Sequence, residues 1–125
     1  MGEHIKKVLI VDDEPNIIIP IEFLMKEQGY HVDTAHNGRL ALAKMESFNP
    51  DVVILDVMMP EMDGFEVARH IRSNESHNQV HIVFLTAKGT DADRLSGYDS
   101  GGEVYLTKPF ENSELVEVVN DLISL

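Results

Sequence analysis

The stretch KVLIVDDEPN, residues 7–16, places two adjacent aspartates directly after a short apolar run, and a proline follows just beyond them. A short, continuous and β-branched apolar run is typical of a strand that is buried on both faces of a sheet. Pro15 suits the first turn of a helix, because its fixed φ is helical and the N–H that it lacks would be unpaired there. The stretch therefore predicts a buried strand, an acidic pair at its end, and a helix that begins close by.

The same kind of apolar run recurs along the chain, each time separated from the next by an amphipathic stretch. Residues 31–35 differ, because Val32 and Thr34 alternate with more polar neighbours, as expected of a half-exposed edge strand. The predicted buried strands cover residues 8–11, 52–55, 82–85 and, more weakly, 104–106.

Helical patterns lie between the predicted strands. Asn37 can cap the second helix, and Asn112 can cap the last one. Asp63, followed by Glu66 three residues later, resembles a capping box. The stretch 91–99 offers little apolar surface to bury, so we expect its helix to be the least stable of the series.

The first helix carries two informative residues. Gly29 sits where a C-terminal cap belongs. Pro20 falls inside the helix, where it removes a backbone donor and crowds the preceding turn. Either a kink or a helix whose ordered part starts later would accommodate Pro20, and both interpretations stay open.

Five strand–helix units in series predict an α/β fold, in which a single doubly wound domain over residues 1–125 has a five-stranded parallel sheet with helices on both faces. The chain has no cysteine, which excludes disulfides and Cys-based zinc sites. Its net charge of −12 argues against direct contact with nucleic acid or an anionic membrane. Because the sequence shows neither a signal peptide nor a membrane-spanning apolar run, we expect a cytoplasmic protein.

Each predicted buried strand is followed by a residue that can bind a cation or a phosphate. These residues are Asp12 with Asp13, then Asp56, Thr86 and Lys108. Because the carboxyl ends of parallel strands meet at one edge of a sheet, we expect these side chains to lie together. Packed carboxylates repel one another, so a lysine and a divalent ion would have to share the site. Hard carboxylate oxygens favour Mg²⁺, for which Mn²⁺ can substitute, and such a site suits in-line phosphoryl transfer to an aspartate.

Four segments carry a resemblance to a known family. They are VLIVDDE (residues 8–14), DVVILDVMMPEMDGFE (residues 51–66), VFLTAK (residues 83–88) and YLTKPF (residues 105–110), in this order and spacing. In these segments the chain resembles the response-regulator receiver domains of two-component signalling, and the resemblance covers nearly the whole sequence. It implies the strand order 2-1-3-4-5 and a switch that is not an enzyme acting on other substrates.

The resemblance also implies a role for each residue of the predicted site. Asp56 would accept a phosphoryl group from a histidine kinase in a Mg²⁺-dependent reaction. The metal ligands would be Asp12, Asp13, Asp56 and the backbone carbonyl of Met58. Thr86 and Lys108 would contact the phosphoryl group, Thr86 and Tyr105 would act as the switch, and the Lys108–Pro109 peptide bond would be cis.

The partners that the resemblance implies are a sensor histidine kinase or phosphotransfer protein, and an output domain or downstream protein. A phosphorylation-dependent homodimer would use the face formed by the fourth helix, the fifth strand and the fifth helix. Residues 101–104 depart from the usual family pattern, and we expect the extra glycine there to loosen the approach to the fifth strand. Tyr105 could also be ordinary strand packing.

Two other classes of protein compete with this interpretation. A phosphatase of the haloacid dehalogenase type would need a second aspartate two residues after the nucleophile, where this chain has Met58. A pseudo-receiver, which only binds partners, would have lost the acceptor or the acidic pair, and both are present here. The histidines are scattered, and we expect His77 and His81 to be exposed to solvent.

Overall fold

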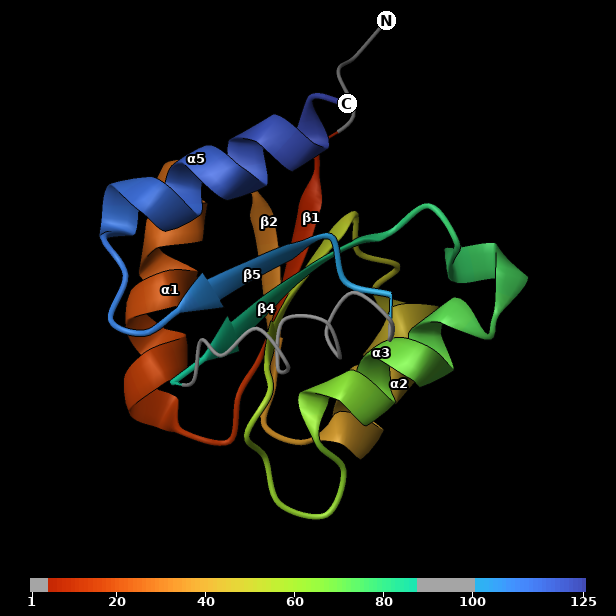
Figure 1. Cartoon of the computed structure of the whole chain (residues 1–125). Helices are drawn as coiled ribbons and strands as arrows, with labels where there is room; N and C mark the ends of the chain where they lie inside the picture. Colours follow the sequence, from red (N-terminus) through yellow and green to blue (C-terminus); the bar gives the residue numbers. More distant parts are fainter. Residues whose placement is uncertain (1–4, 88–100) are drawn as a thin grey trace, which may run out of the picture.

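A five-stranded parallel sheet forms the centre of the computed structural model, which describes residues 5–87 and 101–125 (Figure 1). The strands lie in the order β2-β1-β3-β4-β5, which confirms the predicted α/β fold. The strands are β1 (Lys7–Val11), β2 (His31–Ala35), β3 (Val52–Asp56), β4 (His81–Thr86) and β5 (Val104–Thr107). The helices are α1 (Pro15–Glu27), α2 (Gly38–Ser47), α3 (Gly64–Arg72), the short 3-10 helix η1 (Glu75–His77) and α5 (Asn112–Ile123).

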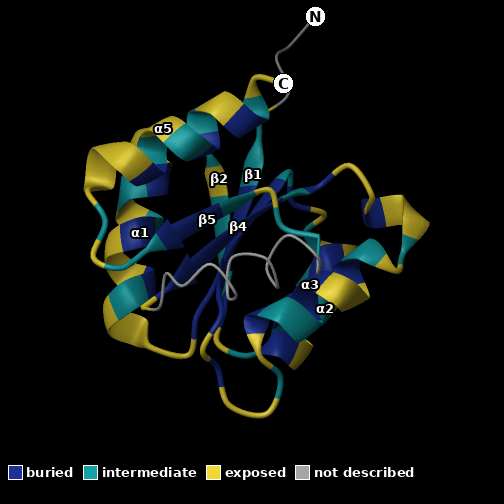
Figure 2. Cartoon of the chain, in the orientation of Figure 1, coloured by how far each residue is buried: buried dark blue, intermediate teal, exposed yellow. Residues whose placement is uncertain are grey.

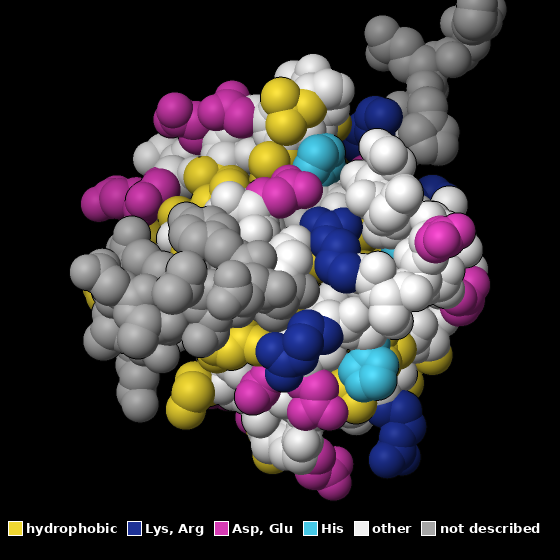
Figure 3. Space-filling model, turned by 45° about the vertical axis from the view of Figure 1, so that its right-hand side comes forward, with side chains coloured by type: hydrophobic (Ala, Val, Ile, Leu, Met, Phe, Trp, Pro, Cys, Tyr) yellow, Lys and Arg dark blue, Asp and Glu magenta, His cyan; other side chains and the backbone are white. Residues whose placement is uncertain are grey.

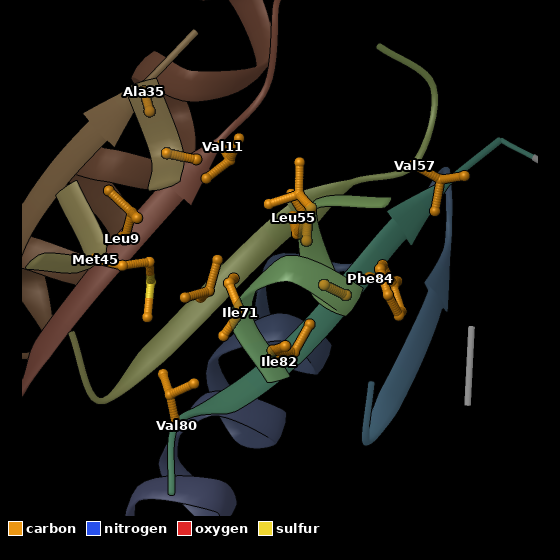
Figure 4. Close-up of a cluster of buried hydrophobic side chains, with 14 of the residues drawn as sticks. Leu9, Val11, Ala35, Met45, Leu55, Val57, Ile71, Val80, Ile82 and Phe84 are labelled. Carbon is orange, nitrogen blue, oxygen red and sulfur yellow. The ribbon is translucent and has the colours of Figure 1, made fainter. Parts of the chain in front are cut away.

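Helices cover both faces of the sheet, with α1 and α5 on one side and α2 and α3 on the other (Figure 1). Alternate residues of each central strand therefore enter different cores: in β1, Val8 and Ile10 face α1 and α5, whereas Leu9 and Val11 face α2 and α3. All five residues of β3 are buried. Figure 2 shows this burial along the middle of the sheet, and Figure 4 shows the core on the α2 and α3 side.

Local signals set most of the helix ends. Asn37 caps α2 by accepting a hydrogen bond from the N–H of Leu40, and Asp63 caps α3 by accepting one from Glu66, as predicted. The prediction for Asn112 is wrong by one position, because Glu111 precedes α5 and makes no side-chain capping bond. Asn112 is instead the first residue of that helix.

Helix α1 begins at Pro15 and runs through Pro20 to Glu27, so its ordered part does not start after this proline. Pro20 is exposed, and the cost is one intrahelical hydrogen bond in the second turn. Gly29 follows the helix with φ of +90°, a left-handed conformation that glycine adopts without strain.

The helix predicted for residues 91–99 lies outside the described residues. Among the residues that the structure describes, no helix is both long enough and apolar enough to cross a membrane.

Candidate functional site

The carboxyl ends of four strands bring the predicted site residues to one edge of the sheet. Asp12 and Asp13 follow β1, Asp56 ends β3, Thr86 ends β4, and Lys108 follows β5 directly. The parallel register fixes these positions, since it pairs Val11 with Leu55, Asp56 with Leu85 and Thr86 with Thr107. The strands, and not the loops alone, therefore position the site.

Three carboxylates form the centre of the site. Asp12, Asp13 and Asp56 each offer an oxygen atom within 4.8 Å of the others, and no other group of three acidic, histidine or cysteine side chains in the described parts of the chain does so. Asp12 and Asp56 are buried, with 1% and 4% of their surface exposed, whereas Asp13 is exposed. Two of the three negative charges are therefore held away from bulk water.

Burial raises the pKa of Asp56 to about 6, and the negative charge of Asp12 adds to the effect. The charge of Lys108 and its hydrogen bond oppose this rise without cancelling it. Burial also raises the pKa of Asp12, against the hydrogen bond from the N–H of Glu14 and the charge of Lys108. Both shifts show that the ionised acids are unfavourable in the metal-free site.

Lys108 is the cation of the site. Its Nζ lies 3.2 Å from Oδ1 of Asp56, to which it donates a hydrogen bond, and 3.6 Å from Oδ2 of Asp12. The main-chain N–H of Lys108 donates to the carbonyl of Thr86 at 2.6 Å, which ties the lysine to the end of β4. The Lys108–Pro109 peptide bond is cis, as the resemblance implied.

The donor set fits a hard divalent cation. Asp12 uses Oδ1 to accept the N–H of Glu14 at 2.9 Å, but its buried Oδ2 accepts no hydrogen bond from the described residues. A buried oxygen without a donor is costly, and a metal ion would satisfy it. Three carboxylates beside one ammonium also leave excess negative charge, which suits Mg²⁺. No contact in the structure tests the predicted ligand from the Met58 carbonyl.

Gly64 is a site residue that the sequence prediction missed. Its N–H donates to the carbonyl of Val57 at 2.9 Å, so the start of α3 lies against the main chain beside Asp56. A Cβ atom at position 64 would lie 2.3 Å from the main-chain oxygen of Asp56. Only glycine allows this close approach, and a glycine after a capping aspartate was the available signal.

Tyr105 lies on the side of the site where β4 and β5 end. The ring is 7% exposed and lies 6.5 Å from Phe65 and 6.2 Å from Phe84. Tyr105 is therefore already buried in this structure. A hollow of about 550 Å³ adjoins the ring, and its lining includes Met58, Thr86 and Tyr105.

The expectation that His77 is solvent-exposed is wrong. His77 is 7% exposed, and its Nε2 lies 3.4 Å from Oε1 of Glu46. His81 is partly buried, and its Nδ1 lies 2.6 Å from Oε2 of Glu103. Both histidines lie far along the sheet from the carboxylates, at the amino end of β4, and they do not join the site.

Comparison with known proteins agrees with the geometry. Residues 8–120 match the sequence model of the family described as the response regulator receiver domain. A curated relative, the alkaline phosphatase synthesis transcriptional regulatory protein PhoP of Bacillus subtilis, is 40% identical over 110 residues, which are 88% of this chain and 45% of PhoP. The chain spans about half the length of the curated relatives that it matches.

Two solved structures share the fold. The chemotaxis protein CheY4 of Vibrio cholerae is 34% identical, with a TM-score of 0.91 and coverage of 95% of this chain and 99% of CheY4. The BeF3-activated DrrB receiver domain is 30% identical, with a TM-score of 0.88 and coverage of 98% of this chain and all of that domain.

Proposed function

This chain belongs to the family of response regulator receiver domains, and on that premise we propose that Asp56 accepts a phosphoryl group from a histidine kinase. Receiver domains are phosphoacceptor switches of two-component signalling, and they bind Mg²⁺ at an acidic aspartate cluster. The observation that carries the proposal is the contact between the Lys108 ammonium and the buried Asp56 carboxylate, beside Asp12 and Asp13.

Asp56 acts as the nucleophile. One of its carboxylate oxygens attacks the phosphorus atom of the donor, the bond from phosphorus to the donor imidazole breaks, and the imidazole keeps the electron pair. The product is an acyl phosphate, so Asp56 exchanges its own negative charge for those of the phosphoryl oxygens. Lys108 already contacts the acceptor, and its ammonium can follow the charge onto the phosphoryl group without a large movement.

Asp12, Asp13, Asp56 and the Met58 carbonyl would hold Mg²⁺, which when bound supplies positive charge for the phosphoryl oxygens. The Thr86 hydroxyl, at the end of β4, would donate a hydrogen bond to one of these oxygens. That bond would draw the loop after β4 toward Asp56 and alter the surface around Tyr105. The altered surface, rather than a released product, is the output of the domain.

A partner would respond to this altered surface. Response regulators interact with histidine kinases and output domains, and PhoP, a transcriptional regulatory protein, is about twice as long as this chain. We infer that this domain controls an output domain or a separate protein, through a dimer or a direct contact. Acidic and basic side chains are interspersed on the described part of the face in Figure 3, which does not favour direct binding to nucleic acid.

Acetyl phosphate tests the proposal without the cognate kinase. With Mg²⁺ present, the protein should gain the mass of one phosphoryl group, and the Asp56→Asn variant should gain none. Asp63→Asn is the matched control, because Asp63 is an exposed aspartate at the end of the loop that follows Asp56, and asparagine caps a helix equally well. Modification that persists in Asp56→Asn, or that maps to a serine, threonine or histidine, would reject the assignment of Asp56.

The same experiment separates the competing classes of protein. A phosphatase would release phosphate through many cycles and accumulate little modified protein, whereas a switch accumulates up to one phosphoryl group per chain. A protein that only binds partners would stay unmodified.

A further inference from the structure

Arg72, the last residue of α3, makes four polar contacts with the segments around it. Its guanidinium donates from Nε to the carbonyl of Gly101 at 3.0 Å and from Nη1 to the carbonyl of Val80 at 2.6 Å. A longer bond of 3.4 Å reaches the carbonyl of His77, and Nη2 lies 3.5 Å from Oε1 of Glu103. One side chain thus joins the end of α3, the entry to β4 and the entry to β5.

The aliphatic stem of Arg72 also packs tightly against the main chain of Gly101. Gly101 has φ of +111°, and a Cβ atom there would lie 2.4 Å from Cγ of Arg72. Gly101 therefore makes room for the arginine, because any side chain at this position would collide with it. Burial of the guanidinium lowers the pKa of Arg72, an effect that the charge of Glu103 opposes.

Glu103 extends these contacts into the sheet. Its N–H donates to the carbonyl of Ile82 at 3.0 Å, and its carboxylate also lies 2.6 Å from His81. Tyr105 follows two residues later and pairs in register with Phe84. The contacts of Arg72 therefore determine where the strand that carries Tyr105 begins.

We propose that Arg72 is a positioning residue, a clamp that fixes the entry of β5 to the end of α3. Helix α3 begins at Gly64, against the main chain of Asp56, so this one helix touches the acceptor at one end and holds β5 at the other. With its entry held, β5 cannot shift along β4 when the site changes. The change that follows phosphorylation should then spare the entry of β5, residues 101–103, a consequence that rests on the proposed function.

Hydrogen exchange of the Glu103 amide tests the clamp in the unmodified protein. Arg72→Lys keeps the charge but loses the planar fork of donors that reaches several carbonyls at once. We expect the Glu103 amide to exchange roughly tenfold faster in this variant, because local opening of the β5 entry no longer breaks those bonds. Arg69→Lys is the matched control, since Arg69 is exposed in the same part of α3. Arg72→Met, which keeps the stem over Gly101, gives a second test if the lysine variant folds poorly.

Beryllofluoride, a phosphoryl mimic, tests the consequence by NMR. In the wild type we expect amide shifts around Asp56, Thr86 and Tyr105 that spare residues 101–103, and in Arg72→Lys we expect them to extend through residues 101–103. In the hydrogen-exchange experiment, a general loss of stability would speed amide exchange in the whole sheet. Loss of the Arg72 contacts would speed it only at the entry of β5.

Equal Glu103 exchange in Arg72→Lys and Arg69→Lys would overturn the clamp. Wild-type NMR shifts at residues 101–103 as large as those around Asp56 would overturn the claim that the entry of β5 stays fixed. If acetyl phosphate leaves Asp56 unmodified, the proposed function fails, and so does the expected pattern of NMR shifts. The hydrogen-exchange comparison uses unmodified protein, so it still tests whether Arg72 holds the entry of β5.

Discussion

Asparagine in place of Asp56 should stabilise the metal-free protein at neutral pH. Burial and the neighbouring Asp12 raise the pKa of Asp56 from its ordinary 3.8 to about 6. Each pKa unit corresponds to about 1.36 kcal/mol between the two protonation states, so keeping this buried group ionised costs roughly 3 kcal/mol at pH 7. Asp56→Asn keeps the shape of the side chain and removes the charge, so it should recover up to that amount.

The contribution of Asp56 to the free energy of unfolding depends on pH. Between about pH 4 and pH 6 the folded protein retains the proton of Asp56 more tightly than the unfolded chain does. In this window the contribution of Asp56 to the free energy of unfolding falls as pH rises, and above pH 6 the cost is complete. The advantage of Asp56→Asn should therefore be roughly 3 kcal/mol at pH 7 and close to zero at pH 4.

Urea unfolding at both pH values measures this difference. The chain has no tryptophan, so far-UV circular dichroism is the appropriate signal, with EDTA present to remove divalent ions. Asp63→Asn alters an exposed aspartate at the end of the loop between β3 and α3. It should change the free energy of unfolding little at either pH. An advantage of equal size at pH 4 and pH 7, or an Asp56→Asn protein less stable than the wild type at pH 7, would refute the reasoning.

Three further predictions follow from the site. Mg²⁺ at ten times its Kd should stabilise the wild type by about 1.4 kcal/mol and Asp13→Ala by much less, each measured against its own metal-free reference; equal gains would reject Asp13 as a ligand. Gly64→Ala should lower the free energy of unfolding in urea by about 1–3 kcal/mol, because the new Cβ meets the main-chain oxygen of Asp56. Gly38→Ala, whose Cβ meets the flexible Met62 side chain as well as Val67, should cost less. A smaller loss of stability in Gly64→Ala than in Gly38→Ala would contradict this prediction. Thr86→Ala should still accept a phosphoryl group on Asp56 by mass spectrometry but should lose the beryllofluoride-induced NMR shifts around Tyr105, and retention of those shifts would exclude Thr86 from the switch.

The strands and the charged site could be predicted because each depends on a short local pattern. A continuous apolar run such as 52–55 has few alternatives to a buried strand, and the parallel arrangement then brings Asp12, Asp56 and Lys108 to one edge. Burial on both faces leaves the register little freedom, since a slip by one residue exchanges the two cores.

The parts that could not be predicted depend on contacts between distant segments. Gly64 is needed because α3 begins against the main chain of Asp56, and Arg72 is held by carbonyls as far away as Gly101. His77 is buried because η1 turns it toward Glu46 on α2, a helix that the local sequence does not indicate as its neighbour. The prediction of the capping residue of α5 was wrong by one position, because the sequence does not show which of two adjacent residues precedes the helix.

The charges of the site explain why acceptance of a phosphoryl group and metal binding belong together. Asp12, Asp13, Asp56 and Lys108 carry a formal charge of −2 when all are ionised, and a divalent cation would cancel it. A phosphoryl group adds about −1.5 to −2 while the phosphorylated Asp56 loses its own charge, so the metal-bound site would end near −1. Without the metal the same site would hold about −3, largely buried, against the single ammonium of Lys108. The excess that remains with the metal bound is small enough for hydrogen bonds to satisfy, and the hydroxyl of Thr86, at the end of β4, would supply one. A bound metal would therefore neutralise the unmodified site and leave only a small excess charge after phosphoryl transfer.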